Sequence, residues 1–154
     1  MMINLEHYSE EHLQALNEIN LPEDQAKFTT LPHQLTEVSE GQHRVVIVAK
    51  DRPIGFFLLN NTERVKTFTD NPNALLLSSL SIDEKEQEKG YAKQAMLLIK
   101  DFVHNEFPNC NEIVLAVNHQ NIAAQKLYFN VGYYDTGRRV DGPVGEQWVM
   151  SLAL

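Results

Sequence analysis

The residues best placed to do chemistry lie between an apolar run that ends at Ile82 and an amphipathic stretch that begins near Tyr91. The chain between them reads Gln87-Glu-Lys-Gly90-Tyr-Ala92, an order that predicts a strand, a tight loop and a helix. The first backbone N–H groups of a helix have no partner inside the helix, and the helix dipole gives them a partial positive charge. Gly90 lets a ligand approach the backbone closely. The segment therefore predicts a site for an anion such as pyrophosphate.

A second candidate segment follows the apolar run 113–117 and extends from Asn121 to Tyr133. Helical spacing places two sets of its residues on neighbouring faces, 121, 124 and 128 on one and 123, 127 and 131 on the other. We expect the first face to line a cleft and the second to pack on a sheet. Taken alone, Tyr128 also fits a core aromatic residue beside Leu127.

Charge and composition narrow the class of protein. The chain has 13 Lys and Arg against 21 Asp and Glu, a net charge of −8, and no basic cluster. Nucleic acids and anionic membranes are therefore not expected partners, because both require concentrated positive charge. A length of 154 residues with 43% hydrophobic residues predicts a single globular domain over 1–154.

Cys110 is the only cysteine, so the chain cannot form an intrachain disulfide, and an idle thiol fits it better than a nucleophile. The first residues lack a basic leader with an apolar core, and no run of apolar residues is long enough to span a bilayer. We expect a cytoplasmic protein.

The remaining pattern supplies the elements that must position the two segments. It predicts the order β-α-α-β-β-β-α-β-α-β-β. The expected strands cover 3–6, 44–50, 54–59, 75–82, 113–117, 133–139 and 147–152, with turns at 51–53 and 141–143 and a polar connection over 60–73. The expected helices start after Ser9 with Leu13, Leu16 and Ile19 on one face, and then cover 32–38, about 92–106 and about 121–131. Strands 75–82 and 113–117, joined by a long helix, should be parallel neighbours that splay where their helices begin.

Both segments resemble signatures of the GNAT acetyltransferase superfamily. Residues Leu80–Ala92 resemble its central strand and pyrophosphate loop, with the Q/R-x-x-G-x-G/A signature, and residues 121–133 resemble N-x-x-A-x-x-L-Y-x-x-x-G-F/Y. The resemblance covers essentially the whole chain in element order. It implies an α/β (α+β) fold with a mixed central sheet of about six to seven strands, helices on both faces and a splayed central parallel strand pair.

The resemblance also implies roles for named residues. Main-chain groups of Leu80, Ser81 and Ile82 would pair with the pantetheine arm of acetyl-CoA as if it were an added strand. Tyr128 would reach the thioester sulfur and protonate the departing thiolate, and no metal is implied. The other cofactor-binding positions are the loop amides of Gln87, Glu88, Lys89, Gly90, Tyr91 and Ala92, and Asn121 and Ala124 on the second helix. The loop acids Asp83, Glu84, Glu86 and Glu88 are expected to face solvent.

The general base and the acceptor stay open at the level of sequence. Many superfamily members carry Glu where this chain has Ser78; serines nearby could relay a proton through water, and Glu146, His119 and His33 are alternatives of which none is assigned. The ending after Gly132 is similar to bacterial polyamine acetyltransferases, which implies transfer to a small, possibly polyamine-like primary amine. Acetylation of a protein or peptide amine and a non-catalytic acyl-CoA-binding module are the alternatives, and a homodimer is a further expectation.

Overall fold

The computed structural model describes residues 3–34 and 38–154. Its strands form one seven-stranded mixed sheet in the order β1-β2-β3-β4-β5-β7-β6. Every neighbouring pair is antiparallel except β4 and β5, which are parallel. The strands are β1 (Ile3–His7), β2 (Gln42–Ala49), β3 (Arg52–Asn60), β4 (Ala74–Ile82), β5 (Glu112–Asn118), β6 (Tyr134–Gly142) and β7 (Gly145–Ala153).

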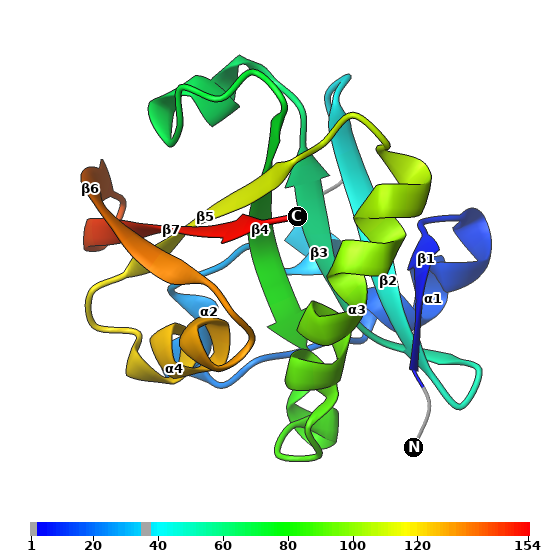
Figure 1. Ribbon diagram of the computed structural model, residues 1–154. Coiled ribbons are helices and arrows are strands. Elements are labelled where there is room, and N and C mark those ends of the chain that lie inside the picture. Colours follow the sequence, from blue (N-terminus) through cyan, green and yellow to red (C-terminus); the bar gives the residue numbers. More distant parts are fainter. Residues whose placement is uncertain (1–2, 35–37) are drawn as a thin grey trace.

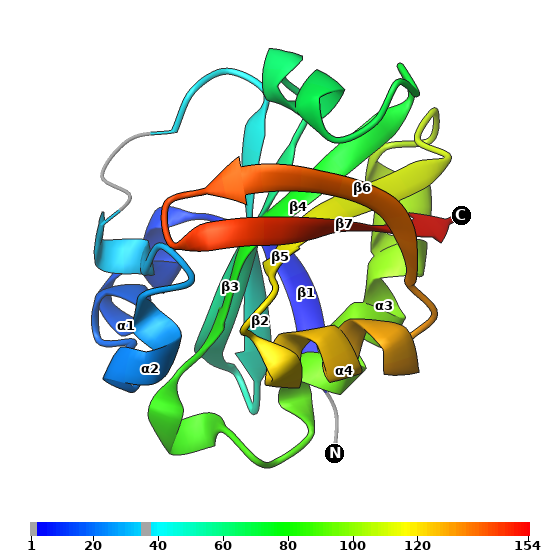
Figure 2. The ribbon, with the colours of Figure 1, turned by 90° about the vertical axis from the view of Figure 1, so that its left-hand side faces the viewer.

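Helices lie on both faces of this sheet (Figure 2). The helices are α1 (Leu13–Asn17), α2 (Glu23–Ala26), α3 (Tyr91–Glu106) and α4 (Ile122–Asn130), with short 3-10 helices at Glu10–His12, Pro32–Gln34, Glu63–Thr67 and Glu84–Glu86. The predicted fold class is confirmed, and so is the predicted order of the seven strands and of helices α3 and α4 between them.

Helix α3 packs on the sheet through the apolar stripe that its spacing predicts. Ala95, Met96, Ile99 and Val103 are buried against the sheet in one core cluster. On the opposite face, Leu16 and Ile19 join the cluster that covers β2 and β3. Leu13, predicted on the same face as those two, is instead 45% exposed. Burial of these two apolar layers fixes the sheet between the helices.

The strands β4 and β5 separate after a short paired stretch, as Figure 1 shows. Their register runs from Ala74 opposite Glu112 to Leu77 opposite Leu115, and no pairs follow. Beyond that point β4 carries one extra residue relative to β3, because Leu58 faces Ser78 whereas Phe56 faces Ser81. A bulge of this kind bends its strand. The predicted splayed parallel pair is therefore confirmed, and the bulge is what turns β4 away.

Two turns lie at other positions than predicted. The β2–β3 turn is at Lys50 and Asp51, whose φ angles of 52° and 64° are those of a tight type I′ hairpin, so β3 already begins at Arg52. The last hairpin turns after Gly142 rather than within 141–143, because β6 continues through Gly142 and β7 starts at Gly145.

The two connections without strong periodicity were predicted least well. The expected helix 32–38 is a 3-10 turn over Pro32–Gln34, Val38 is not helical, and residues 35–37 lie outside the described residues. Helix α2 was not predicted. The connection 60–73 was predicted as polar, yet it contains a 3-10 helix whose Val65 is buried, together with Phe68, in a third apolar cluster.

Candidate active site

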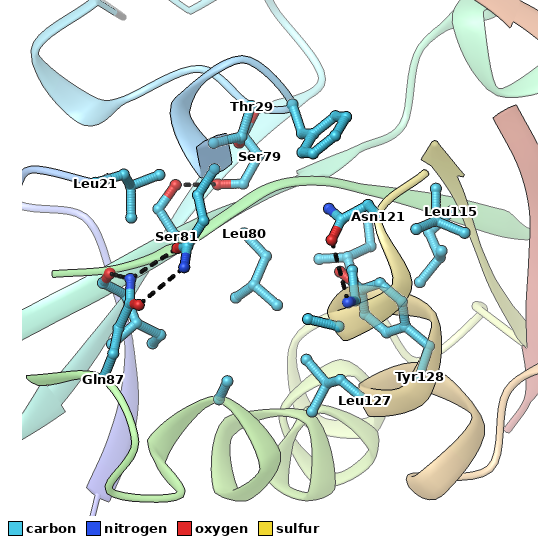
Figure 3. Close-up of a pocket in the computed structure, with 18 of the residues that line it drawn as sticks. Leu21, Thr29, Ser79, Leu80, Ser81, Gln87, Leu115, Asn121, Leu127 and Tyr128 are labelled. Carbon is cyan, nitrogen blue, oxygen red and sulfur yellow. Dashed lines mark hydrogen bonds between the residues drawn. The ribbon is translucent and has the colours of Figure 1, made fainter. Parts of the chain in front are cut away.

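A cleft of about 440 Å³ opens where β4 and β5 part (Figure 3). Its walls come from β4 and β5, the start of α3, helix α4, and the segment that contains α2. Leu80 lies in the middle of the close-up, between Ser81 and Gln87 on one side and Asn121 and Tyr128 on the other. The predicted residues that line the cleft are Leu80, Ser81, Ile82, Gln87, Glu88, Gly90, Tyr91, Ala92, Asn121, Ala124 and Tyr128.

The predicted anion loop leads directly into α3. Gly90 adopts a left-handed conformation, with φ of 82°, at the N-cap of that helix. A Cβ added there would meet only the Nε2 atom of Gln94, at 3.9 Å, so the space beside the loop is open. The first N–H groups of α3 point out of the helix unpaired, and together with that space they fit a phosphate group.

The side chain of Gln87 holds the loop in place rather than reaching into the cleft. Its Nε2 atom donates to the carbonyl oxygen of Ile82 at 2.8 Å. The carboxamides of Gln87 and Gln25 also donate to each other, at 2.9 and 3.1 Å, so the loop is joined to α2. A second link joins the same segments, because Glu84 N donates to Asn20 O at 2.9 Å.

The charged side chains of the loop are placed only partly as expected. The ammonium group of Lys89 pairs with Glu86 at 3.0 Å and does not line the cleft, whereas the role predicted for Lys89 is that of its main-chain amide. Asp83 does not face solvent: it is 5% exposed and its Oδ1 atom accepts a hydrogen bond from Asn20 N at 3.4 Å. Glu84 and Glu88 are exposed as expected. Anion binding at this loop would therefore depend on main-chain N–H groups.

Helix α4 begins at Asn121, whose Oδ1 atom caps it by accepting from Ala124 N at 3.3 Å. The packing face of α4 agrees with the prediction only in part: Leu127 and Val131 pack on the core cluster as expected, but Ala123 does not. Gln125 and Tyr128 are its buried residues, whereas Ala123 is exposed and lines the cleft. Gln125 anchors the helix because its Nε2 atom donates to Asn118 O and His119 O, both at 3.0 Å.

Tyr128 reaches the cleft from a buried position. It is 8% exposed, and its ring meets that of Tyr133 edge to face with centroids 5.4 Å apart. Burial raises the pKa of Tyr128 far above its ordinary value, because the phenolate would lose its hydration. The hydroxyl group therefore keeps its proton throughout the neutral range and can act as a hydrogen-bond or proton donor.

The opposite wall contains residues that sequence reasoning missed. Leu21, Gln25, Phe28 and Thr29 line the cleft from the segment around α2. Phe28 and Thr29 follow α2 in a stretch without apolar alternation, so no periodic signal marks them. Thr29 Oγ1 is buried and has no hydrogen-bond partner among the described residues.

The candidate general bases differ in whether they line the cleft. Ser78 lines the cleft, whereas Glu146 and His119 are exposed and do not belong to its lining. The Glu146 carboxylate faces the guanidinium of Arg139 instead, with Nε of Arg139 3.9 Å from Oε1. The side chain of His33 lies outside the described residues.

The cleft between the parallel strands leads to the N-terminus of α3. This arrangement suits an extended thiol carrier that ends in phosphate groups. Main-chain groups along β4 can pair with such a carrier, and Tyr128 lines the same cleft. Fold and site together define the class of acyltransferases that use a coenzyme A thioester.

Comparisons with known proteins agree with this class. The profile of the Acetyltransferase (GNAT) family matches residues 9–133. The chain is 46% identical over 152 residues to the uncharacterized N-acetyltransferase YbbJ of Bacillus subtilis (strain 168), covering 96% of this chain and 95% of that protein. The chain therefore belongs to the acetyltransferase (GNAT) family and is an N-acetyltransferase with acetyl-CoA as its cosubstrate.

Solved structures share the fold at low sequence identity. The aminoglycoside acetyltransferase AAC(6')-Ib in complex with coenzyme A superposes with a TM-score of 0.75 at 16% identity, covering 99% of this chain and 95% of that one. The spermidine N-acetyltransferase from Vibrio cholerae in complex with CoA and spermine gives 0.73 at 17% identity, covering 98% and 95%. Among the described residues, no helix is both long and apolar enough to cross a membrane.

Proposed function

We propose that this protein transfers the acetyl group of acetyl-CoA directly to the primary amine of a small molecule. The observation that supports this proposal is that one cleft joins the loop at Gly90, the main chain around the bulge of β4 and the hydroxyl-bearing ring of Tyr128 to a separate wall around Phe28. The loop and strand would hold the donor, and the wall would hold the acceptor.

In this proposal, acetyl-CoA is bound mainly by main-chain groups. The backbone of Leu80, Ser81 and Ile82 would pair with the pantetheine arm, because no strand of the described residues pairs with β4 on its β5 side beyond Leu77. The amides from Gln87 to Ala92 would hold the pyrophosphate. Asn121 and Ala124 would contact the pantetheine from α4. Lys89 would contribute only its main-chain amide, because its side chain pairs with Glu86.

The acetyl thioester supplies an activated carbonyl carbon, and the protein must manage two protons. An alkylamine with a pKa near 10.4 is neutral in only about one molecule in a few thousand at pH 7, so a proton must leave before attack. Tyr128 would donate a proton to the departing thiolate, and main-chain N–H groups near Leu80 would stabilise the negative charge that develops on the acetyl oxygen.

A covalent enzyme intermediate is not part of this proposal. Cys110 does not line the cleft, and its Sγ atom donates to Glu112 O at 3.2 Å. Burial raises the pKa of the Cys110 thiol, which disfavours the nucleophilic thiolate. Direct attack by the amine is the simpler route.

The proposed acceptor wall is formed by the neutral side chains of Leu21, Phe28 and Thr29. The charged side chains among the described residues that line the cleft are Glu86, Glu88 and Lys93, and these lie on the loop and at the start of α3. Structural relatives have been solved with kanamycin, an aminoglycoside, and with spermine, a polyamine. A polyamine-like acceptor for this chain is thus a proposal to be tested against less highly charged amines.

An acceptor panel tests the proposal. Purified protein and acetyl-CoA are incubated with polyamines, aminoglycosides, aromatic and aliphatic monoamines, and peptides with free N-termini, and free thiol is followed. Turnover with a small amine supports the proposal. Turnover with peptides alone would select protein acetylation, and acetyl-CoA binding without transfer to any amine would select a non-catalytic binding module.

The acceptor wall yields a separate prediction. Phe28→Ala should raise the KM for the acceptor about tenfold, the worth of one aromatic contact of roughly 1–1.5 kcal/mol, without changing the Kd of acetyl-CoA. Phe129→Ala is the matched control, because Phe129 is 47% exposed on α4 and does not line the cleft. Equal effects of the two substitutions on KM would remove Phe28 from the acceptor site.

Three broader expectations are part of the proposal. We propose that residues 1–154 act as one domain in the cytoplasm and that the protein forms a homodimer. Sedimentation analysis tests the last point, and a monomer at micromolar concentration would refute it.

A further inference from the structure

Ser78 occupies a distinctive position in β4. It directly follows Leu77, the last residue of β4 that pairs with β5, and it lines the cleft where the strands begin to part. Its Oγ atom lies 3.0 Å from Nδ2 of Asn60, which is on β3. Asn60 is the last residue of its strand and is fully buried, with 0% exposure.

The orientation of the Asn60 carboxamide follows from its partners. The main-chain oxygen of Leu76 lies 2.9 Å from it and can only accept, so the atom that faces Leu76 must be Nδ2. On the other side, Gln42 Nε2 donates to Asn60 Oδ1 at 3.1 Å. Gln42 has its own oxygen occupied, because Oε1 accepts from Ser39 N and Ser39 Oγ at 2.9 and 3.1 Å.

These hydrogen bonds fix the direction of the bond between Asn60 and Ser78. Both hydrogens of Asn60 Nδ2 are used, one by Leu76 O and one by Ser78 Oγ. Ser78 therefore accepts from Asn60 and cannot donate to it. The hydroxyl hydrogen of Ser78 and its second lone pair are left for groups in the cleft.

We propose that Ser78 relays the proton that the attacking amine must lose, and that Asn60 is the positioning residue that sets the direction of this relay. The inference rests on the proposed function. The ammonium N–H bond breaks as its proton passes to the free lone pair of Ser78 Oγ, and the Ser78 O–H bond breaks as that proton passes to a cleft water. The amine keeps the electron pair for attack, Ser78 ends neutral, and the water hands one proton to the solvent.

Removing the hydroxyl group gives the first test. Ser78→Ala should lower kcat/KM about 10²-fold at pH 7 for an alkylamine acceptor, the lower end of general acid–base effects. The loss should shrink several-fold as the pH approaches the pKa of the amine, because a neutral amine has one proton fewer to lose. A fluorinated analogue of the same acceptor, neutral at pH 7, should show the same smaller loss. A loss that is identical for both amines and at every pH would overturn the relay.

A double-mutant cycle tests the role of Asn60. Asn60→Ala should lower kcat/KM for the alkylamine about tenfold when Ser78 is present and less than twofold when residue 78 is already alanine. Additive losses would show that Asn60 acts only through the stability of the sheet. Ser151→Ala controls for removal of a buried serine hydroxyl, because Ser151 is 1% exposed on β7 and bonds to Glu112 away from the cleft.

Two further readouts separate this inference from the proposed function. In the free protein, the side-chain amide protons of Asn60 should exchange slowly with solvent, and their NMR shifts should move in Ser78→Ala; fast exchange would contradict the fixed carboxamide. Calorimetry should give the same acetyl-CoA Kd for every variant. If the unmodified protein acetylates no amine, the proposed function fails; if it does, and Ser78→Ala acts at the normal rate, the relay alone fails.

Discussion

Replacing Tyr128 by phenylalanine is expected to lower kcat by about 10²- to 10³-fold, the usual contribution of one positioned proton donor. The ring stays in its buried site against Tyr133, so the packing of α4 is preserved. The thiolate then has to leave without a proton from the protein. Stopped-flow or steady-state assays of thiol release measure the change. Calorimetry should find the Kd of acetyl-CoA within about threefold of the original.

Tyr133→Phe is the matched control, because it removes the same atom from a ring centred 5.4 Å away. The Tyr133 hydroxyl is buried without a hydrogen-bond partner among the described residues. Its removal should therefore leave kcat unchanged and raise the free energy of unfolding by about 1 kcal/mol. Normal turnover in Tyr128→Phe, or an equal loss in both variants, would exclude Tyr128 as the donor of the proton.

Gly55→Ala should disrupt the site through the backbone. A Cβ at this position of β3 would lie 2.4 Å from Ser81 O and 2.9 Å from Ile82 Cδ1, so the end of β4 would have to move. We expect a loss of roughly 2–3 kcal/mol in the free energy of unfolding, typical of overpacking, as measured by urea denaturation. Acetyl-CoA affinity should fall at least tenfold in the molecules that remain folded, because β4 would no longer present Leu80–Ile82 correctly.

Gly137→Ala provides the comparison for that experiment. A Cβ there meets no atom within 4 Å, so only the left-handed backbone, with φ of 85°, opposes the substitution. The expected cost is about 1 kcal/mol, and acetyl-CoA affinity should not change. Similar affinities for acetyl-CoA in both glycine variants would show that the end of β4 does not hold the donor.

The sequence was informative where local chemistry and tertiary structure agree. The loop before α3 carries its own signals, a glycine at the left-handed N-cap and an apolar stripe that starts just after it. The same holds for α4, where Asn121 caps the helix and Gly132, with φ of 106°, follows its C-cap residue. Both segments could therefore be placed to within a residue or two.

Other parts of the site depend on contacts that no local pattern encodes. Ser79 has a φ of 59°, a conformation that serine rarely adopts by itself, and it lies in the bulge of β4, where Ser81 Oγ donates to its carbonyl oxygen at 3.3 Å. Asn60 resembles a loop residue in sequence but is buried by Gln42, Leu76 and Ser78 from other strands. Phe28 and Thr29 line the cleft from a segment that Gln25 and Asn20 join to the loop before α3, a contact between parts of the chain far apart in sequence.

The short junction between β4 and β5 has a practical consequence. Only the four register pairs from Ala74–Glu112 to Leu77–Leu115 join these two strands in the described sheet. A ligand bound between the strands beyond these pairs would contact both strands. Because it would bind the folded state and not the unfolded chain, its binding would raise the free energy of unfolding of the whole domain. At a hundred times its Kd, such a ligand adds about 2.7 kcal/mol to the unfolding free energy. Melting curves recorded with graded concentrations of coenzyme A can thus rank donors before any acceptor is known.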